Sequence, residues 1–314
     1  MTPLRLKPNY ISPIWSGDRI ARARGIVYDK GTPPGESFDV TAHRDLVNTV
    51  EGGPYDGIRL DELIDTHHEE LLGRGLPDDD GVIQVVTMDA RESLSVQVHP
   101  DEAYAQAHEN DHEKTESWYI LAADPGATLI AGSTTNDRDA LRAAAADDTV
   151  GDRFGRRVSV SEGDFILIPA GTMHALGAGI FAVEIGSLGF KTYRICDWGR
   201  GRELHVKQGF DLIDTSLRPE PRHLGAFDPN GPDQVQLGVT HELFEAEVVD
   251  VHGEFAGELL DRYQILTCVW GDAQVSTPEG GTTDLKFTES LLIPASAGSY
   301  TVRGTCRVIR SYRP

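Results

Sequence analysis

The chain has 314 residues, 39% of them hydrophobic, which is enough to bury a substantial core in two domains or in one large one. Fifty acidic and 29 basic residues give a formal charge of -21, and the resulting field repels the phosphates of nucleic acids and anionic membranes. The 3 cysteines are too widely spaced for a disulfide framework, and no apolar run approaches the roughly 18 residues of a membrane span. We therefore expect a cytoplasmic protein with no nucleic-acid or membrane partner.

The first 50 residues are predicted to form short outer strands rather than helices, because proline interrupts helices. The prolines of this part are Pro3, Pro8, Pro13, Pro33 and Pro34. Apolar residues at near-helical spacing from Leu60 to Leu72, followed by Gly73, predict a short amphipathic helix. On this helix the adjacent His67 and His68 point about 100° apart, so we expect surface residues and no shared metal.

A strand pair is predicted from Val82 to Val98, and its end delivers two polar residues, Gln97 and His99. Alternation along a strand places both side chains on one face. Glu116 opens a second apolar run, and His174 closes a third after a Pro-x-Gly corner suited to a sharp turn. Two imidazoles, one carboxylate and one amide oxygen suit a zinc-like ion that keeps a position open for water or substrate. We predict one Zn²⁺ per chain at these four residues.

The remainder of the chain is predicted to be mostly strand. An Ala-rich stretch at 137–148 predicts a helical excursion, and prolines and glycines at 216–235 predict a linker. From Glu242 to Arg310 strand patterns return with Gly and Pro turns, which fits a jelly-roll barrel. Ser290 to Tyr300 parallels the segment that ends at His174, but it has no histidine in the corresponding place. We expect this second barrel to bind no metal.

Several segments resemble known motifs. Gly163 to His174 follows the pattern Gly-x5-Pro-x-Gly-x2-His, which is similar to the second sequence motif of cupins. The Gln97-Val-His-Pro100 run with a delayed Lys114-Thr-Glu-Ser-Trp-Tyr119 resembles the class I mannose-6-phosphate isomerases (phosphomannose isomerases) of the cupin superfamily. Gly35 to His43, Thr192 to Arg194 and Arg202 to His205 are similar to further motifs of that family, in the same order.

The resemblance covers nearly the whole chain and implies a mainly β fold of two cupin-type jelly-roll barrels with a few short helices. We expect a metal-binding catalytic domain at 1–215 with the helical excursion at about 137–150, a linker at 216–235, and a metal-free cupin-like domain at 236–314. The implied activity is metal-dependent interconversion of mannose 6-phosphate and fructose 6-phosphate through an enediol or enediolate.

The resemblance also implies residue roles. It assigns metal binding to Gln97, His99, Glu116 and His174. It assigns a catalytic, substrate-facing role to Lys114 and Arg194. Lys114 is two positions before Glu116, so both are expected on one strand face; the alternative is a surface ion pair of Lys114 with Glu113 or Asp111. The general base stays open among a metal-bound hydroxide, Lys114 and Glu184.

One segment departs from the family pattern. Phe190 stands where an aspartate is expected, and Lys191 adds a cation. We expect Lys191 to help bind the sugar phosphate as part of a basic cluster with Lys114, Arg194, Arg200 and Arg202. This departure favours an alternative, a cupin isomerase or epimerase that acts on another sugar phosphate. A noncatalytic sugar-binding cupin is a further alternative. An iron oxygenase fits less well because Gln97 would occupy a position that oxygen needs. We expect a monomer or a homodimer.

Overall fold

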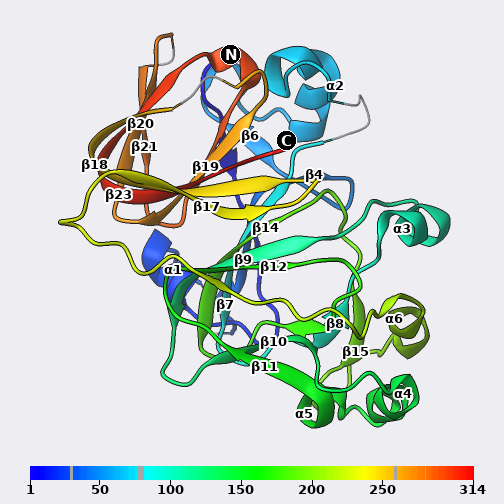
Figure 1. Cartoon of the computed structure of the whole chain (residues 1–314). Coiled ribbons are helices and arrows are strands. Elements are labelled where there is room, and N and C mark those ends of the chain that lie inside the picture. The colour runs from blue at the N-terminus through cyan, green and yellow to red at the C-terminus, as the bar shows by residue number, and fades with distance from the viewer. Residues whose placement is uncertain (29–30, 77–80, 258–259, 280) are drawn as a thin grey trace.

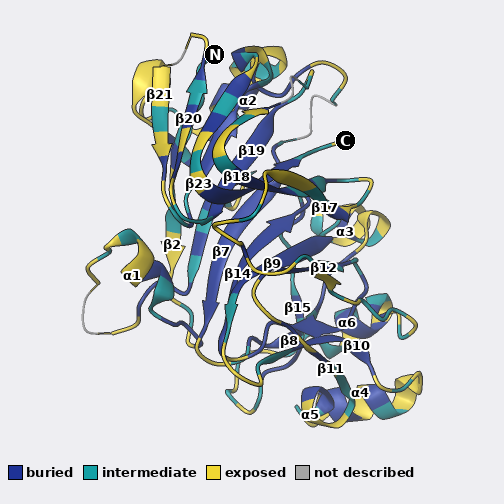
Figure 2. Cartoon of the chain, turned by 60° about the vertical axis from the view of Figure 1, so that its left-hand side comes forward, coloured by how far each residue is buried: buried dark blue, intermediate teal, exposed yellow. Residues whose placement is uncertain are grey.

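The computed structural model describes residues 1–28, 31–76, 81–257, 260–279 and 281–314. The predicted mainly β fold is confirmed: antiparallel strands hold far more of the described residues than helices do, and the helices are short and lie at the periphery (Figure 1). Figure 2 shows that the strands are largely buried, whereas the helices expose one side. Among the described residues, no helix combines the length and the apolar character that crossing a membrane requires.

Two sheets form the part of the molecule that carries the predicted metal ligands. The larger sheet contains, in spatial order, β16 (Arg222–His223), β12 (Asp164–Ile168), β9 (Glu116–Ala123), β14 (Ile180–Gly186), β7 (Gln84–Ala90), β3 (Glu36–Val40) and β2 (Asn9–Ile11). The second sheet contains β11 (Gly155–Ser159), β10 (Thr128–Ser133), β13 (His174–Ala175), β8 (Val96–Val98) and β15 (Tyr193–Cys196). Trp118 and Ile166 of the larger sheet pack with Leu129 and Val158 of the smaller one in a common apolar core. The arrangement is a sandwich of the jelly-roll type.

A third sheet is formed by the C-terminal part of the chain. It contains β17 (Gln234–Thr240), β18 (Glu245–Gly257), β23 (Tyr300–Tyr312), β19 (Gln264–Trp270) and β22 (Ser290–Ile293), with β20 (Ala273–Thr277) and β21 (Gly281–Leu285) attached through β23. Val251, Leu266 and Val302 belong to its own apolar core. The linker predicted at 216–235 contains β16, which pairs with β12. The proposed division into domains stays a prediction.

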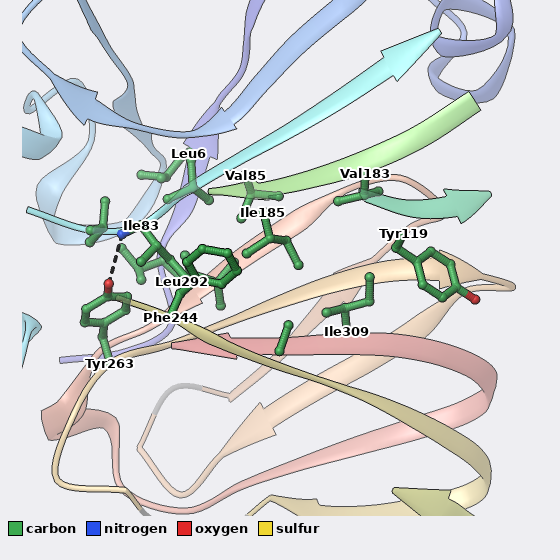
Figure 3. Close-up of a cluster of buried hydrophobic side chains, with 14 of the residues drawn as sticks. Leu6, Ile83, Val85, Tyr119, Val183, Ile185, Phe244, Tyr263, Leu292 and Ile309 are labelled. Atoms are coloured by element: carbon green, nitrogen blue, oxygen red, sulfur yellow. Dashed lines mark hydrogen bonds between the residues drawn. The ribbon is translucent and has the colours of Figure 1, made fainter. Parts of the chain in front are cut away.

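A single buried cluster joins the third sheet to the larger sheet of the first pair (Figure 3). Val85 and Ile185 come from one side of this cluster, and Phe244 and Ile309 come from the other. The hydroxyl of Tyr263 accepts a hydrogen bond of 2.9 Å from the backbone N–H of Ile83 across the same junction. The two parts of the chain are therefore joined by an apolar cluster that both contribute to, in addition to the core that each has of its own.

The helices follow local sequence signals, with one correction. The predicted amphipathic helix is α2 (Leu60–Leu71), and the Ala-rich stretch forms α4 (Arg138–Ala146), where Asp137 caps two backbone N–H groups. The prediction that the first 50 residues contain no helix is wrong, because α1 (Arg19–Arg24) lies in the proline-free interval between Pro13 and Pro33. Ile20 anchors α1 in the core, and Gly25 ends it with a φ of 64°.

Further short elements complete the chain. They are α3 (Glu102–Glu109), α5 (Val150–Phe154), α6 (Val206–Leu212), the 3-10 turns η1 (Gly53–Tyr55) and η2 (Ala295–Ala297), and the small strands β1 (Arg5–Lys7), β4 (Ala42–His43), β5 (Leu46–Val47) and β6 (Thr49–Glu51). Leu141 of α4, Val150 of α5 and Phe210 of α6 share an apolar cluster with Val96 and Ile195 of the five-stranded sheet. These helices therefore back the strands that carry Gln97 and Arg194.

Candidate active site

Three of the four predicted metal ligands converge at the ends of neighbouring strands. Glu116 opens β9, His174 opens β13, and His99 directly follows β8. The Nε2 atom of His99 lies 3.1 Å from Glu116 Oε2 and 3.1 Å from His174 Nε2, and His174 Nε2 lies 3.2 Å from Glu116 Oε1. The side chains are at most 1% exposed. Their donor atoms lie within 4.8 Å of one another, close enough to share one ion.

The turn before His174 holds this ligand in place. Thr172 donates its backbone N–H to Pro169 at 3.1 Å, and Gly171 donates its own to the carbonyl of His99 at 3.0 Å. Gly171 has a φ of 80°, and a Cβ there would lie 3.1 Å from the carbonyl oxygen of Leu212. The glycine of the Pro-x-Gly corner is thus required by the fold, and the turn ties one histidine ligand to the other.

The backbone also selects the tautomer of each histidine. The Nδ1 atom of His99 lies 3.0 Å from the carbonyl of Lys191, and that of His174 lies 2.8 Å from the carbonyl of Thr172. A carbonyl only accepts, so each Nδ1 carries the proton and each neutral ring turns an Nε2 lone pair inward. Burial and then the charge of Lys114 lower the pKa of His99 to about 3, which keeps its ring neutral.

The donor set fits a divalent cation. Two inward lone pairs 3.1 Å apart repel each other unless a positive charge lies between them and the carboxylate. The Oε1 atom of Glu116 is buried without a hydrogen-bond donor, as expected when neither facing Nε2 carries a proton. Neutral imidazoles with a carboxylate are common ligands of zinc.

Gln97, the fourth predicted ligand, occupies the centre of β8. It is the direct partner of His174 on β13 and of Arg194 on β15. Directly opposed residues of antiparallel strands point to the same face of a sheet. Gln97 also lines the charged cavity described below, and it stands between His174 of the ligand cluster and Arg194.

Lys114 is the main counter-charge of the ligand cluster. Its Nζ atom lies 2.9 Å from Glu116 Oε2 and 3.5 Å from Glu184 Oε1, and its side chain is 14% exposed. Burial opposes the charged form, but these carboxylates outweigh it and raise the pKa of Lys114. The alternative of a surface ion pair with Glu113 or Asp111 is therefore wrong.

A cavity of about 300 Å³ opens beside the cluster. Polar lining residues are Glu36, Gln84, Ser95, Gln97, Lys114, Glu184, Thr192, Arg194 and Arg202, and apolar ones include Trp15, Phe38 and Phe190. His99, Glu116 and His174 are outside this lining and connect to it through Lys114. Volume and composition suit a small, strongly polar ligand.

Two carboxyl groups line the cavity together with Lys114: Glu184, which is buried, and Glu36, which is partly buried. Burial, followed by the charge of Glu116, raises the pKa of Glu184 to about 7, and burial followed by the charge of Glu184 raises that of Glu36 to about 7. Trp118 Nε1 donates to Glu184 Oε2 at 3.2 Å. Sequence reasoning missed Glu36, although it lies in the Gly35 to His43 motif. Groups that titrate near neutral pH are suited to proton transfer.

The basic residues predicted to bind phosphate separate into two groups. Arg194 and Arg202 line the cavity, and Arg200 lies close to both around the buried Asp197. Lys191 is outside the lining: its side chain is 42% exposed, and its Nζ atom lies 2.8 Å from Glu109. The role of Lys191 in phosphate binding stays a prediction, while its carbonyl orients His99.

Phe190 is fixed against the cavity wall. Its ring stacks on His43 with 4.8 Å between ring centroids, and it contacts Phe38 at 5.7 Å. Asp111 holds both neighbours, accepting the Phe190 N–H at 3.2 Å and lying 3.1 Å from His43 Nε2. The departure from the family pattern thus lies in the cavity.

Comparison with known proteins gives a consistent result. A family model described as mannose-6-phosphate isomerase, cupin domain, matches residues 236–313. A mannose-6-phosphate isomerase of Streptococcus mutans is 39% identical over 319 residues, which cover 99% of this chain and 98% of the relative. The chain belongs to the mannose-6-phosphate isomerase family.

Solved structures of the family agree with the fold. A crystal structure of the mannose 6-phosphate isomerase from Bacillus subtilis has a TM-score of 0.88 and 27% identity, covering 99% of this chain and 100% of the other. A zinc-bound mannose 6-phosphate isomerase has a TM-score of 0.77 at 16% identity, covering 100% of each chain, and speaks to the fold alone. Membership of the family also removes the noncatalytic sugar-binding alternative.

Proposed function

We propose that this chain is a zinc-dependent aldose-ketose isomerase that interconverts mannose 6-phosphate and fructose 6-phosphate. The observation that carries the proposal is the convergence of His99, Glu116 and His174 beside a charged cavity. Relatives named mannose-6-phosphate isomerase match nearly the whole length of this chain.

Zinc would be held by Gln97, His99, Glu116 and His174. The zinc-bound relative supports the identity of the ion, and the buried donor set supports the ligands. When bound, the ion polarises the substrate carbonyl and stabilises the oxygens of the enediolate. The backbone carbonyls of Lys191 and Thr172 keep both imidazoles in the ligating tautomer.

Proton transfer between C1 and C2 of the substrate falls to the pair Lys114 and Glu184. Both line the cavity, and Lys114 Nζ lies 3.5 Å from Glu184 Oε1, so the charge of each group affects the protonation of the other. Glu184 titrates near neutral pH, so it can take a proton and return it, while the ammonium of Lys114 stabilises nearby negative charge. Trp118 donates to the other oxygen of Glu184 and so orients its carboxylate.

Arg194 and Arg202 bind the anionic end of the substrate and the charge that develops on it. Their planar guanidinium groups offer several donors in a fixed fork, which matches a phosphate. Arg194 is the direct strand partner of Gln97, which places the cation beside the metal ligands.

We further infer a cytoplasmic location and a monomeric or homodimeric state. The location is supported by Cys196, Cys268 and Cys306, which are buried and unpaired. The charge of -21 supports the absence of a nucleic-acid partner.

The test is the conversion of mannose 6-phosphate to fructose 6-phosphate by the purified protein before chelation, after chelation and after return of Zn²⁺. We expect turnover that chelation abolishes and zinc restores. Phe190 in the cavity wall favours a second candidate, isomerisation of another aldose phosphate. Turnover of a different sugar phosphate, with none of mannose 6-phosphate, would select that candidate instead.

A further inference from the structure

Three arginines gather around one buried carboxylate beside the cavity. Asp197 is 1% exposed, and its Oδ1 atom lies 2.6 Å from Arg202 Nη2, 3.4 Å from Arg200 Nη2 and 3.9 Å from Arg194 Nε. Its other oxygen accepts the backbone N–H of Arg202 at 2.9 Å. The carbonyl of Asp197 accepts from Arg200 Nε at 2.9 Å. A single residue therefore contacts all three guanidinium groups.

The loop that carries Asp197 is fixed from several sides. The carboxylate of Asp148 accepts the backbone N–H groups of Asp197 and Gly199. Trp198 adopts a φ of 56° and donates its Nε1–H to the carbonyl of Leu94 at 2.6 Å. A Cβ at Gly151 would lie 2.5 Å from the Trp198 ring. This anchoring holds the carboxylate at one place relative to the cavity.

Asp197 does not accept hydrogen bonds from all of the buried arginine donors around it. Arg202 takes up the carboxylate through three N–H groups, and Arg194 Nε and Arg200 Nη2 remain buried without a hydrogen-bond acceptor. Burial lowers the pKa of both Arg194 and Arg200, and the charge of Arg202 lowers both further. Buried donors without acceptors are costly, so the cluster is short of one anion.

The remaining charge suits a phosphate. Asp197 contacts three guanidinium groups and Glu92 lies 4.0 Å from Arg200 Nη1, so these groups together stay positively charged, and a phosphate monoester carries about -1.5 to -2 at neutral pH. Arg194 and Arg202 reach the cavity lining, whereas Asp197 lies behind them. Without the carboxylate three like charges would repel one another and turn toward water.

We infer that Asp197 is a positioning residue that holds Arg194 and Arg202 in place as the binding site for the phosphate of the substrate. The inference rests on the proposed function, because it assumes that the anion entering the cavity is a sugar phosphate. Asp197 is outside the cavity lining, so it acts through the guanidinium groups.

The experiment compares the zinc-loaded wild type with Asp197→Asn. We expect the KM for mannose 6-phosphate and the inhibition constant of inorganic phosphate to rise together by roughly tenfold or more, since charge-assisted hydrogen bonds are lost. Zinc content should stay the same, and kcat should fall by a smaller factor than KM rises. Direct calorimetric titration with inorganic phosphate gives the affinity independently of turnover.

The matched control is Asp250→Asn. Asp250 forms an equally buried ion pair with Arg307, with side chains 3% and 2% exposed, and it is outside the cavity. This variant should lose thermal stability but keep KM and phosphate affinity within about twofold, because it leaves the three cavity-side arginines untouched.

An unchanged phosphate affinity in folded Asp197→Asn, or no phosphate binding by the wild type, would overturn the inference. If Asp197→Asn does not fold, Arg202→Gln takes its place, since that side chain is 30% exposed; unchanged phosphate affinity in this variant overturns the inference as well. If the wild type fails to isomerise mannose 6-phosphate, the proposed function fails, while the calorimetric comparison still tests Asp197.

Discussion

Lys114 places its ammonium group 2.9 Å from the carboxylate of Glu116, and that carboxylate also faces both histidine ligands. The cluster therefore has two cations competing for one negative charge once a metal ion is bound. A bound divalent ion offsets the negative charge of Glu116 and so lowers the pKa of Lys114, whereas loss of the ion raises it. Metal content and the protonation of Lys114 are consequently linked.

One tightly bound zinc ion per chain is expected, because four ligands support one another. Elemental analysis of protein prepared without added metal measures the stoichiometry. His99→Ala and His174→Ala should each reduce it, whereas His68→Ala on α2 should leave it unchanged. A stoichiometry near zero, or wild-type metal content in both ligand variants, would show that the site is wrongly placed.

Arg194→Ala should keep the metal and lose most turnover. The removed cation acts on charge that develops during the reaction, and the loss of one such donor costs on the order of 10²-fold in kcat. Steady-state kinetics and metal analysis of the same preparation check both parts. Activity within a few-fold of the wild type would make Arg194 a structural residue.

Phe190 should influence which sugar phosphate is used. An aspartate can accept hydrogen bonds from sugar hydroxyls and Phe190 cannot, so we expect activity on mannose 6-phosphate that is weak or shared with other aldose phosphates. Kinetics on a panel of hexose and pentose phosphates, repeated with Phe190→Asp, test this. Phe190→Leu is the control that keeps an apolar wall. High efficiency confined to mannose 6-phosphate in the unmodified protein would contradict the expectation.

The metal-free protein should lose stability as the pH falls below 6.5. The pKa of His99 is about 3 when folded and 6.5 when unfolded, so between these values the unfolded chain binds more protons. His99 then contributes a fall of about 1.4 kcal/mol per pH unit of acidification. Urea denaturation of chelated protein between pH 7.5 and 5 measures the slope. His99→Gln cannot titrate in this range and should show a shallower slope; equal slopes would refute the prediction.

Tyr263→Phe should reduce the free energy of unfolding by about 1–3 kcal/mol, because the buried N–H of Ile83 loses its acceptor. Urea denaturation gives the value. Tyr10→Phe is the control: this side chain belongs to a residue that is 42% exposed, and its substitution should cost less than about 0.5 kcal/mol. Equal losses in the two variants would mean that the junction hydrogen bond contributes nothing.

The ligand cluster could be predicted because each of its members carries a local signal. Gln97 and His99 share a strand face, and the Pro-x-Gly corner predicts the turn before His174. The structure brings His99, Glu116 and His174 together as expected. Residue spacing along a strand determines the direction in which a side chain points, and this spacing can be read from a single sequence.

Other parts of the site depend on contacts between distant segments. Glu36 reaches the cavity because β3 pairs with β7. The Gly35 to His43 motif marks this segment, but the motif alone does not show which of its side chains faces the cavity. Lys191 is drawn away from the cavity by Glu109 on α3. A usable signal did exist for Asp197, which is the only acidic residue in the otherwise basic stretch from Arg194 to Arg202.

Tyr119 lies three residues beyond Glu116 on β9, and its hydroxyl accepts a hydrogen bond of 3.2 Å from Arg307 on β23. Arg307 in turn is paired with Asp250 on β18. Exchange of one half of the gene between relatives would keep Arg307 with Asp250 but would pair Arg307 with a foreign residue in place of Tyr119, and a buried guanidinium that loses an acceptor is destabilising. We therefore expect the C-terminal half to be inherited together with the catalytic half, although it contributes none of the proposed metal ligands.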